Sequence, residues 1–149
     1  MSVAWTSSLC RIGVLAAGIA WAAPAGAAEF PFGRELLLDA APMRPSKRIP
    51  SITVASDGSA VLDLWCRSVP AKAEVGAGTI AIVPAVPPAE LSQQELPAMQ
   101  GPGQCDDQRQ RADAELLAAL TQAAGWTSDG EAVTLTGGPQ PLRFHPATN

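Results

Sequence analysis

The fold is decided by residues 51–69, which read SITVASDGSAVLDLWCRSV. Residues 51–55 alternate apolar and polar side chains, a pattern typical of a half-buried β-strand. Asp57-Gly58 supplies the positive φ angle that a tight hairpin turn requires. Residues 60–69 are predicted to return as one strand. Because side chains alternate along a strand, its core face would carry Leu62, Leu64 and Cys66, and its opposite face Val61, Asp63, Trp65 and Arg67.

Further strands are predicted on both sides of this hairpin. Residues 34–39 precede it, and residues 71–75 and 79–83 follow as a pair joined by a glycine-rich turn. Two more strands, residues 131–136 and 141–145, are predicted near the C-terminus, the first after an Asp-Gly turn. Strands, one helix and strands again predict an α+β domain: a curved antiparallel β-sheet or partial barrel packed on one main α-helix.

The one strong helix signal follows Cys105. Asp106 is placed to cap the helix, and Gly125 is expected to end it in the left-handed conformation. Apolar residues recur along the segment at helical spacing, namely Ala112, Leu116, Ala119, Leu120 and Ala123. Two pairs four residues apart, Arg109–Asp113 and Arg111–Glu115, are expected as ion pairs on the exposed side.

Residues 1–27 have the three parts of a cleavable secretory signal peptide, expected as a helix before the domain. A polar start ends at Arg11, an uncharged apolar stretch covers residues 12–23, and small residues 25–27 follow Pro24. We expect cleavage after Ala27, with Ala28 as the alternative. An uncleaved membrane anchor is disfavoured, because about a dozen apolar residues fall short of the roughly 20 that span a bilayer. The mature chain, residues 28–149, is then periplasmic or secreted and has no transmembrane span.

Removal of the signal peptide takes Cys10 with it and leaves one pair of cysteines. In an oxidising compartment Cys66 and Cys105 have a single intramolecular partner choice, so we predict a disulfide between them. The alternative is two separate buried thiols. Their spacing does not fit a C-x-x-C redox motif, and two cysteines with one histidine do not make a zinc site.

The remaining composition favours one small acidic domain. The whole chain has 10 basic and 14 acidic residues, and its basic clusters at 44–48 and 109–111 are short. Nucleic-acid binding is therefore not expected. Residues 84–104 hold many Pro, Gly and Gln residues and are predicted to form one long connection, which is either mobile or functional. We expect a single-domain monomer.

No catalytic constellation is evident in the sequence. It contains no G-x-S-x-G elbow, no G-x-x-x-x-G-K loop and no G-x-G-x-x-G motif between a strand and a helix. His145 is the only histidine and lies near the C-terminus, without an evident base-orienting partner. Asp106-Asp107 is better explained as helix capping than as a cation site. The prediction is a non-catalytic protein without cofactor or metal.

Trp65 is the residue that most suggests a binding surface. On the predicted outer face it would lie with Val61 and Arg67, and an exposed aromatic side chain beside an apolar one can form a binding patch. The alternative is that the proline-rich segment covers Trp65, or that the sheet curls so that both faces are buried.

The order of these parts resembles the META domain family, the family of the bacterial heat-shock protein HslJ. The resemblance rests on Asp57-Gly58, Trp65-Cys66-Arg67, Cys105 with residues 115–120, and the segments 129–135 and 142–144. The chain would be a divergent member, because Trp65-Cys66-Arg67 stands where the family has Gly-Cys-Asn, and Pro-Gly-Gln precedes Cys105 in place of Thr-x-Met-Ala. The resemblance implies a split β-barrel with a helix and a location in the envelope or outside the cell. It also implies links to stress or antibiotic tolerance.

Together these observations predict a non-catalytic envelope or secreted protein that binds another protein or an apolar ligand through the sheet face or barrel mouth. The alternative is a periplasmic inhibitor or chaperone-like module that acts through the proline-rich segment. An enzyme ranks third.

Overall fold

The computed structural model describes residues 28–85 and 105–148, which form eight strands and one helix. These elements are β1 (Glu35–Leu38), β2 (Ser51–Val54), β3 (Ser59–Asp63), β4 (Ser68–Val75), β5 (Ile80–Pro84), α2 (Asp107–Gln122), β6 (Gly125–Ser128), β7 (Val133–Thr136) and β8 (Leu142–Pro146). The predicted signal peptide at 1–27 and residues 86–104 of the predicted proline-rich connection lie outside the described residues. Pro84 belongs to β5 rather than to that connection.

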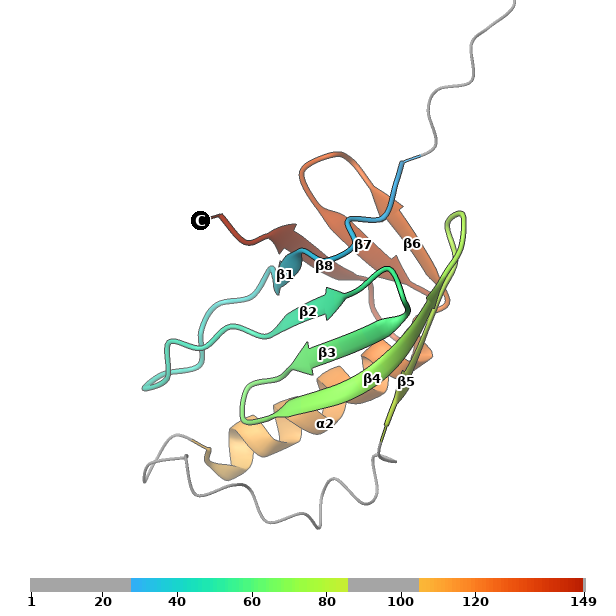
Figure 1. Ribbon diagram of the computed structural model, residues 1–149. Helices are drawn as coiled ribbons and strands as arrows, with labels where there is room; N and C mark the ends of the chain where they lie inside the picture. The colour runs from blue at the N-terminus through green and yellow to red at the C-terminus, as the bar shows by residue number, and fades with distance from the viewer. Residues whose placement is uncertain (1–27, 86–104, 149) are drawn as a thin grey trace, which may run out of the picture.

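All strands form one antiparallel sheet in the order β5-β4-β3-β2-β1-β8-β7-β6. The sheet curls until its two edge strands approach each other (Figure 1). At this seam the amide of Ile80 donates to the Ala124 carbonyl at 3.2 Å, and that of Trp126 donates to the Gly78 carbonyl at 3.0 Å. The expected curved sheet with one main helix is therefore confirmed, in the form of a nearly closed barrel.

The core lies inside the curled sheet and is closed by α2, which packs against β5. Alternating residues of the strands point inward, as the sequence predicts for Leu62, Val133, Leu135 and Phe144. The helix contributes buried apolar side chains at helical spacing, namely Leu116, Leu117, Ala119 and Leu120. The helix is thus fixed with one face in the core.

The predicted return strand over residues 60–69 is wrong in one respect: the chain turns in its middle. β3 ends at Asp63, and β4 begins at Ser68 and runs back beside it, with Asp63 opposite Ser68 in the register. The amide of Leu64 donates to the Arg67 carbonyl at 2.7 Å and closes the turn. The alternation of side chains along a single strand therefore does not predict where the side chains of Trp65 and Arg67 lie.

Two expectations for the helix are also wrong. Gly125 does not adopt a positive φ angle; the helix ends at Gln122, Ala123 is extended, and Gly125 opens β6. A Cβ atom on Gly125 would lie 2.8 Å from the Thr136 hydroxyl, so glycine serves close packing of strands there. Arg109 and Asp113, expected on the exposed side, are each only 1% exposed.

Candidate functional site

The turn between β3 and β4, residues 64–67, is held by the carboxylate of Asp113 on α2. The amide of Trp65 donates to Asp113 Oδ1 at 2.7 Å, and the amide of Cys66 lies 3.2 Å from both carboxylate oxygens. The Arg67 guanidinium adds an ion pair, with Nε 3.4 Å from Oδ2. A buried turn has no strand partner for its amides, so a carboxylate that accepts them satisfies what would otherwise be orphaned donors.

A disulfide fastens the same turn to the start of the helix. Cys66 and Cys105 are bonded as predicted, with their Cα atoms 5.5 Å apart. Asp106 follows as the N-cap and accepts a hydrogen bond from the Arg109 amide at 2.9 Å. The turn is therefore tied to the first half of α2 covalently at Cys105 and by hydrogen bonds at Asp113.

Arg109 ties the helix to a second loop. Its Nη2 atom donates to the main-chain carbonyl of Arg44 at 2.9 Å and lies 3.6 Å from Asp106 Oδ2. The Arg109 side chain is buried, whereas the Asp106 side chain is 50% exposed. The same half of the helix thus positions two segments that lie outside the strands: the turn at 64–67 and the loop around Arg44.

A groove with a volume of about 490 Å³ lies between α2 and the sheet. One wall is the helix, which contributes Ala112, Glu115, Leu116, Ala118 and Ala119. The other wall is assembled from the end of β1, the β3–β4 turn, the β7–β8 loop and the start of β8, which contribute Leu38, Trp65, Pro139, Gln140 and Leu142. We call this site the α2 groove.

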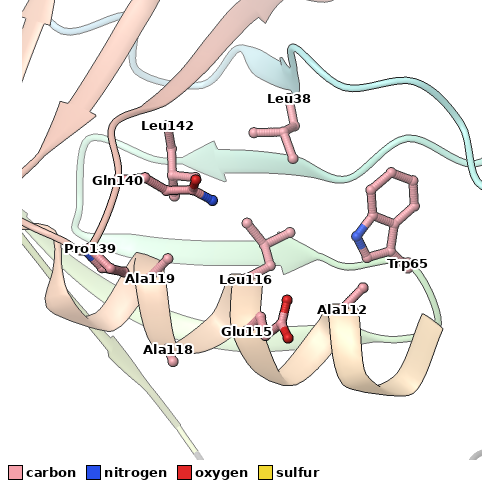
Figure 2. A pocket seen from close by; sticks show the side chains of 10 residues that line it. All are labelled: Leu38, Trp65, Ala112, Glu115, Leu116, Ala118, Ala119, Pro139, Gln140 and Leu142. Carbon is pink, nitrogen blue, oxygen red and sulfur yellow. The ribbon is translucent and has the colours of Figure 1, made fainter. Parts of the chain in front are cut away.

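Trp65 stands at one end of the α2 groove, and Pro139 and Gln140 stand at the other (Figure 2). Leu116 rises from the helix between them, opposite Leu38. Trp65 is half-buried, so one part of its ring packs against the protein while another part remains available. The groove is mostly apolar and of the size at which pockets hold small ligands or single side chains of a partner.

Three polar groups border this apolar surface: the indole N–H of Trp65, the Glu115 carboxylate and the Gln140 amide. Figure 2 shows the indole nitrogen on the side of the ring that faces the groove. Within residues 28–85 and 105–148, none of the three side chains makes a hydrogen bond or ion pair. They can therefore pair with a bound molecule without breaking an existing contact.

The carboxylate that holds the main chain of Trp65 has a perturbed pKa. Burial raises the pKa of Asp113 above its ordinary 3.8, while the Trp65 and Cys66 amides and Arg67 oppose the rise. In contrast, hydrogen bonds from Ser59 lower the pKa of Asp57 in its exposed turn. Asp113 does not line the groove, so its role in the site is to position Trp65.

The three residues predicted as one binding surface do not share a face. Val61 is 43% exposed, as expected, but it lies on the outer face of β3 opposite Pro70. Trp65 borders the α2 groove, and the side chain of Arg67 turns back to Asp113. His145 lies elsewhere, with Nε2 3.4 Å from Asp39 Oδ2 in an exposed pair.

The sequence contained a signal for Asp113 that alternation and pairing rules missed. Arg109 and Asp113 are spaced four apart and continue the apolar stripe of Leu116, Leu117 and Leu120 toward the N-terminus. Charged residues on the core-facing stripe of a helix indicate buried polar partners rather than surface ion pairs. For Leu38, Pro139 and Gln140 the sequence holds no comparable signal, because only the closed sheet brings them to the helix.

No group of three or more histidine, cysteine or acidic side chains suited to a metal occurs in the described part of the chain. Among the same residues, no helix is long and apolar enough to cross a membrane. Comparison of the chain with family models, with curated proteins and with solved structures finds no match.

Proposed function

We propose that this protein is a periplasmic or secreted, non-catalytic binding protein of the META type that holds an apolar ligand or a segment of another protein in the α2 groove. The observation that carries the proposal is Trp65, a half-buried aromatic side chain at the end of a largely apolar groove of about 490 Å³. Tryptophan dominates binding energy in such positions because it contributes a large rigid apolar area.

The attachment of Trp65 supports this role. Its main chain is fixed by Asp113, and its neighbour Cys66 is bonded to Cys105. Because the main chain is held in place before binding, only the side-chain torsions of Trp65 remain to be ordered when a ligand arrives, which favours affinity. The two fixed walls make the α2 groove a preformed site rather than one assembled by the ligand.

Two further observations favour a location outside the cytoplasm. A disulfide between Cys66 and Cys105 is a bond that persists in oxidising compartments. Phe30, soon after the expected cleavage site, is only 4% exposed and packs edge-on against Trp126 at 5.2 Å. Packing against the core is thus already present close to the expected cleavage site. A stress-related role in the envelope follows from the META resemblance and is part of the same proposal.

The proposal is tested with a neutral apolar fluorophore, N-phenyl-1-naphthylamine, titrated into the protein. We expect binding that Trp65→Ala weakens at least about thirtyfold, since an aromatic anchor is worth about 2 kcal/mol or more. Val61→Ala removes an exposed apolar side chain from another surface and serves as the matched control. Ala112→Leu narrows the groove without removing Trp65 and should also weaken binding. Equal affinity in all four proteins would refute the α2 groove as the site.

A further inference from the structure

We propose that the occupant of the α2 groove is a short extended peptide segment of a partner protein, in which an apolar side chain is followed by a lysine or arginine. This inference rests on the proposed function and specifies its ligand. It is carried by the charge and the unpaired hydrogen-bonding groups that border the groove.

The polar groups of the groove suit a peptide better than a hydrocarbon chain. The Trp65 indole N–H is a donor, and the Gln140 amide is both donor and acceptor. Both are without hydrogen bonds among the described residues, and both stand at ends of the groove in Figure 2. A peptide main chain offers a carbonyl to the first and an amide or carbonyl to the second. An acyl chain would cover the indole N–H and leave it unsatisfied, which is unfavourable.

The charge of the groove selects a cation. Among the described residues, Glu115 is the single charged residue that lines the groove, and it is exposed. Arg111, one turn earlier on the helix, was expected to pair with it, but the structure contains no such ion pair among the described residues. A fatty acid or phospholipid would bring a second negative charge to this carboxylate. A lysine or arginine side chain would instead complement it.

The dimensions of the groove match about three extended residues. Its helical wall runs from Ala112 to Ala119, which at 1.5 Å per residue is about 10 Å. An extended peptide advances about 3.3 Å per residue, so three residues span that length. One apolar side chain then lies against Trp65 and Leu116, and a neighbouring cationic side chain reaches Glu115.

The test compares three probes that differ in one residue: acetyl-Phe-Leu-Lys-amide, acetyl-Phe-Leu-Gln-amide and acetyl-Phe-Leu-Glu-amide. Binding is followed on the ¹⁵N-labelled protein through the indole N–H resonance of Trp65, assigned with Trp65→Phe. We expect the lysine peptide to shift this resonance and to bind about fivefold more tightly than the glutamate peptide, as one partly exposed charge contact allows. Glu115→Gln should abolish the difference. Glu131→Gln, which neutralises an exposed acid in the β6–β7 turn, should preserve it.

Other outcomes would refute the cationic specificity, the peptide occupant or the α2 groove as a binding site. Equal binding of the three peptides, or tighter binding of the glutamate peptide, refutes the cationic specificity and leaves the proposed function standing. A shift caused only by sub-micellar dodecyl maltoside identifies a hydrocarbon occupant. An indole resonance that moves with protein concentration alone identifies a second copy of this chain. If no probe moves the Trp65 resonance, the proposed function itself fails.

Discussion

Replacement of Asp113 by alanine is the sharpest test of how the site is built. The substitution removes the acceptor for the amides of Trp65 and Cys66 and the ionic partner of Arg67. It does not remove the disulfide, and it does not touch the groove surface. Any loss of stability therefore reports how far the β3–β4 turn depends on this one carboxylate.

The expected loss follows from the contacts to Asp113 that the substitution removes. The buried Cys66 amide would lose both carboxylate oxygens as acceptors, which costs about 1–3 kcal/mol. The Trp65 amide and the Arg67 guanidinium are nearer to water, and we assign each about 1 kcal/mol. The sum is about 3–5 kcal/mol, the range observed when one partner of a buried ion pair is removed. With a urea m-value of about 1.5 kcal/mol/M, the unfolding midpoint should fall by about 2–3 M.

The assay is equilibrium urea unfolding at neutral pH, followed by far-ultraviolet circular dichroism, with the disulfide verified by non-reducing mass spectrometry. Asp113→Asn keeps one acceptor oxygen for both amides and should lose only about 1–2 kcal/mol. Asp107→Ala removes an exposed acid from the same helix and serves as the control, with an expected loss of at most about 1 kcal/mol. If Asp113→Ala is no less stable than Asp107→Ala, the turn does not depend on the carboxylate and the reasoning is wrong.

Three further predictions concern other parts of the framework. Joint replacement of Cys66 and Cys105 by serine should lower the free energy of unfolding by about 4 kcal/mol, because the bond closes a loop with a sequence separation of 39; the reduced wild type should match the variant in urea. Gly58→Ala should lower the free energy of unfolding by about 1–2 kcal/mol, because Gly58 has φ +84° and the new Cβ would lie 3.1 Å from the Ala73 carbonyl oxygen. The loss in thermal unfolding should exceed that of Gly130→Ala, whose Cβ meets open space. Because burial raises the folded pKa of Asp113 above 3.8, the folded state binds more protons than the unfolded state between the two pKa values. The free energy of unfolding of wild type relative to Asp113→Asn should therefore fall as pH rises through that window and be constant above it. Urea unfolding over a pH series measures this quantity. If the advantage of wild type over Asp113→Asn grew with rising pH, the raised pKa would be contradicted.

Much of the sheet was predictable because its determinants are local. Asp57-Gly58 fixed the β2–β3 hairpin, and Gly58 does adopt a positive φ angle. Alternation identified Leu62, Val133 and Leu135 as core residues. The turn at residues 64–67 was missed because it contains no glycine, proline or asparagine. Its stability comes from Asp113, far along the chain, and no rule based on neighbouring residues detects such a partner.

The candidate site was only partly predictable for the same reason. Trp65 was singled out as an unusual aromatic residue, and it does border the α2 groove. Its partners Leu38 and Leu142 come from opposite ends of the domain and meet only because β1 pairs with β8. The exposed patch predicted with Val61 assumed a continuous strand. Once the chain turns at Leu64, Val61 and Trp65 belong to different surfaces.

The buried charges of α2 determine which polar groups of the proposed binding site remain for a ligand. Asp113 and Arg109 are consumed in holding two loops, so neither is available to a ligand. Apart from Glu115, the helical wall of the groove is made of alanine and leucine, which favour any apolar group of suitable shape. Under this proposal, discrimination comes from Glu115 and Gln140, which are exposed and make no hydrogen bond or ion pair in the described residues. It follows that Glu115→Gln should change which peptide binds without changing the free energy of unfolding. Asp113→Ala should instead lower the free energy of unfolding.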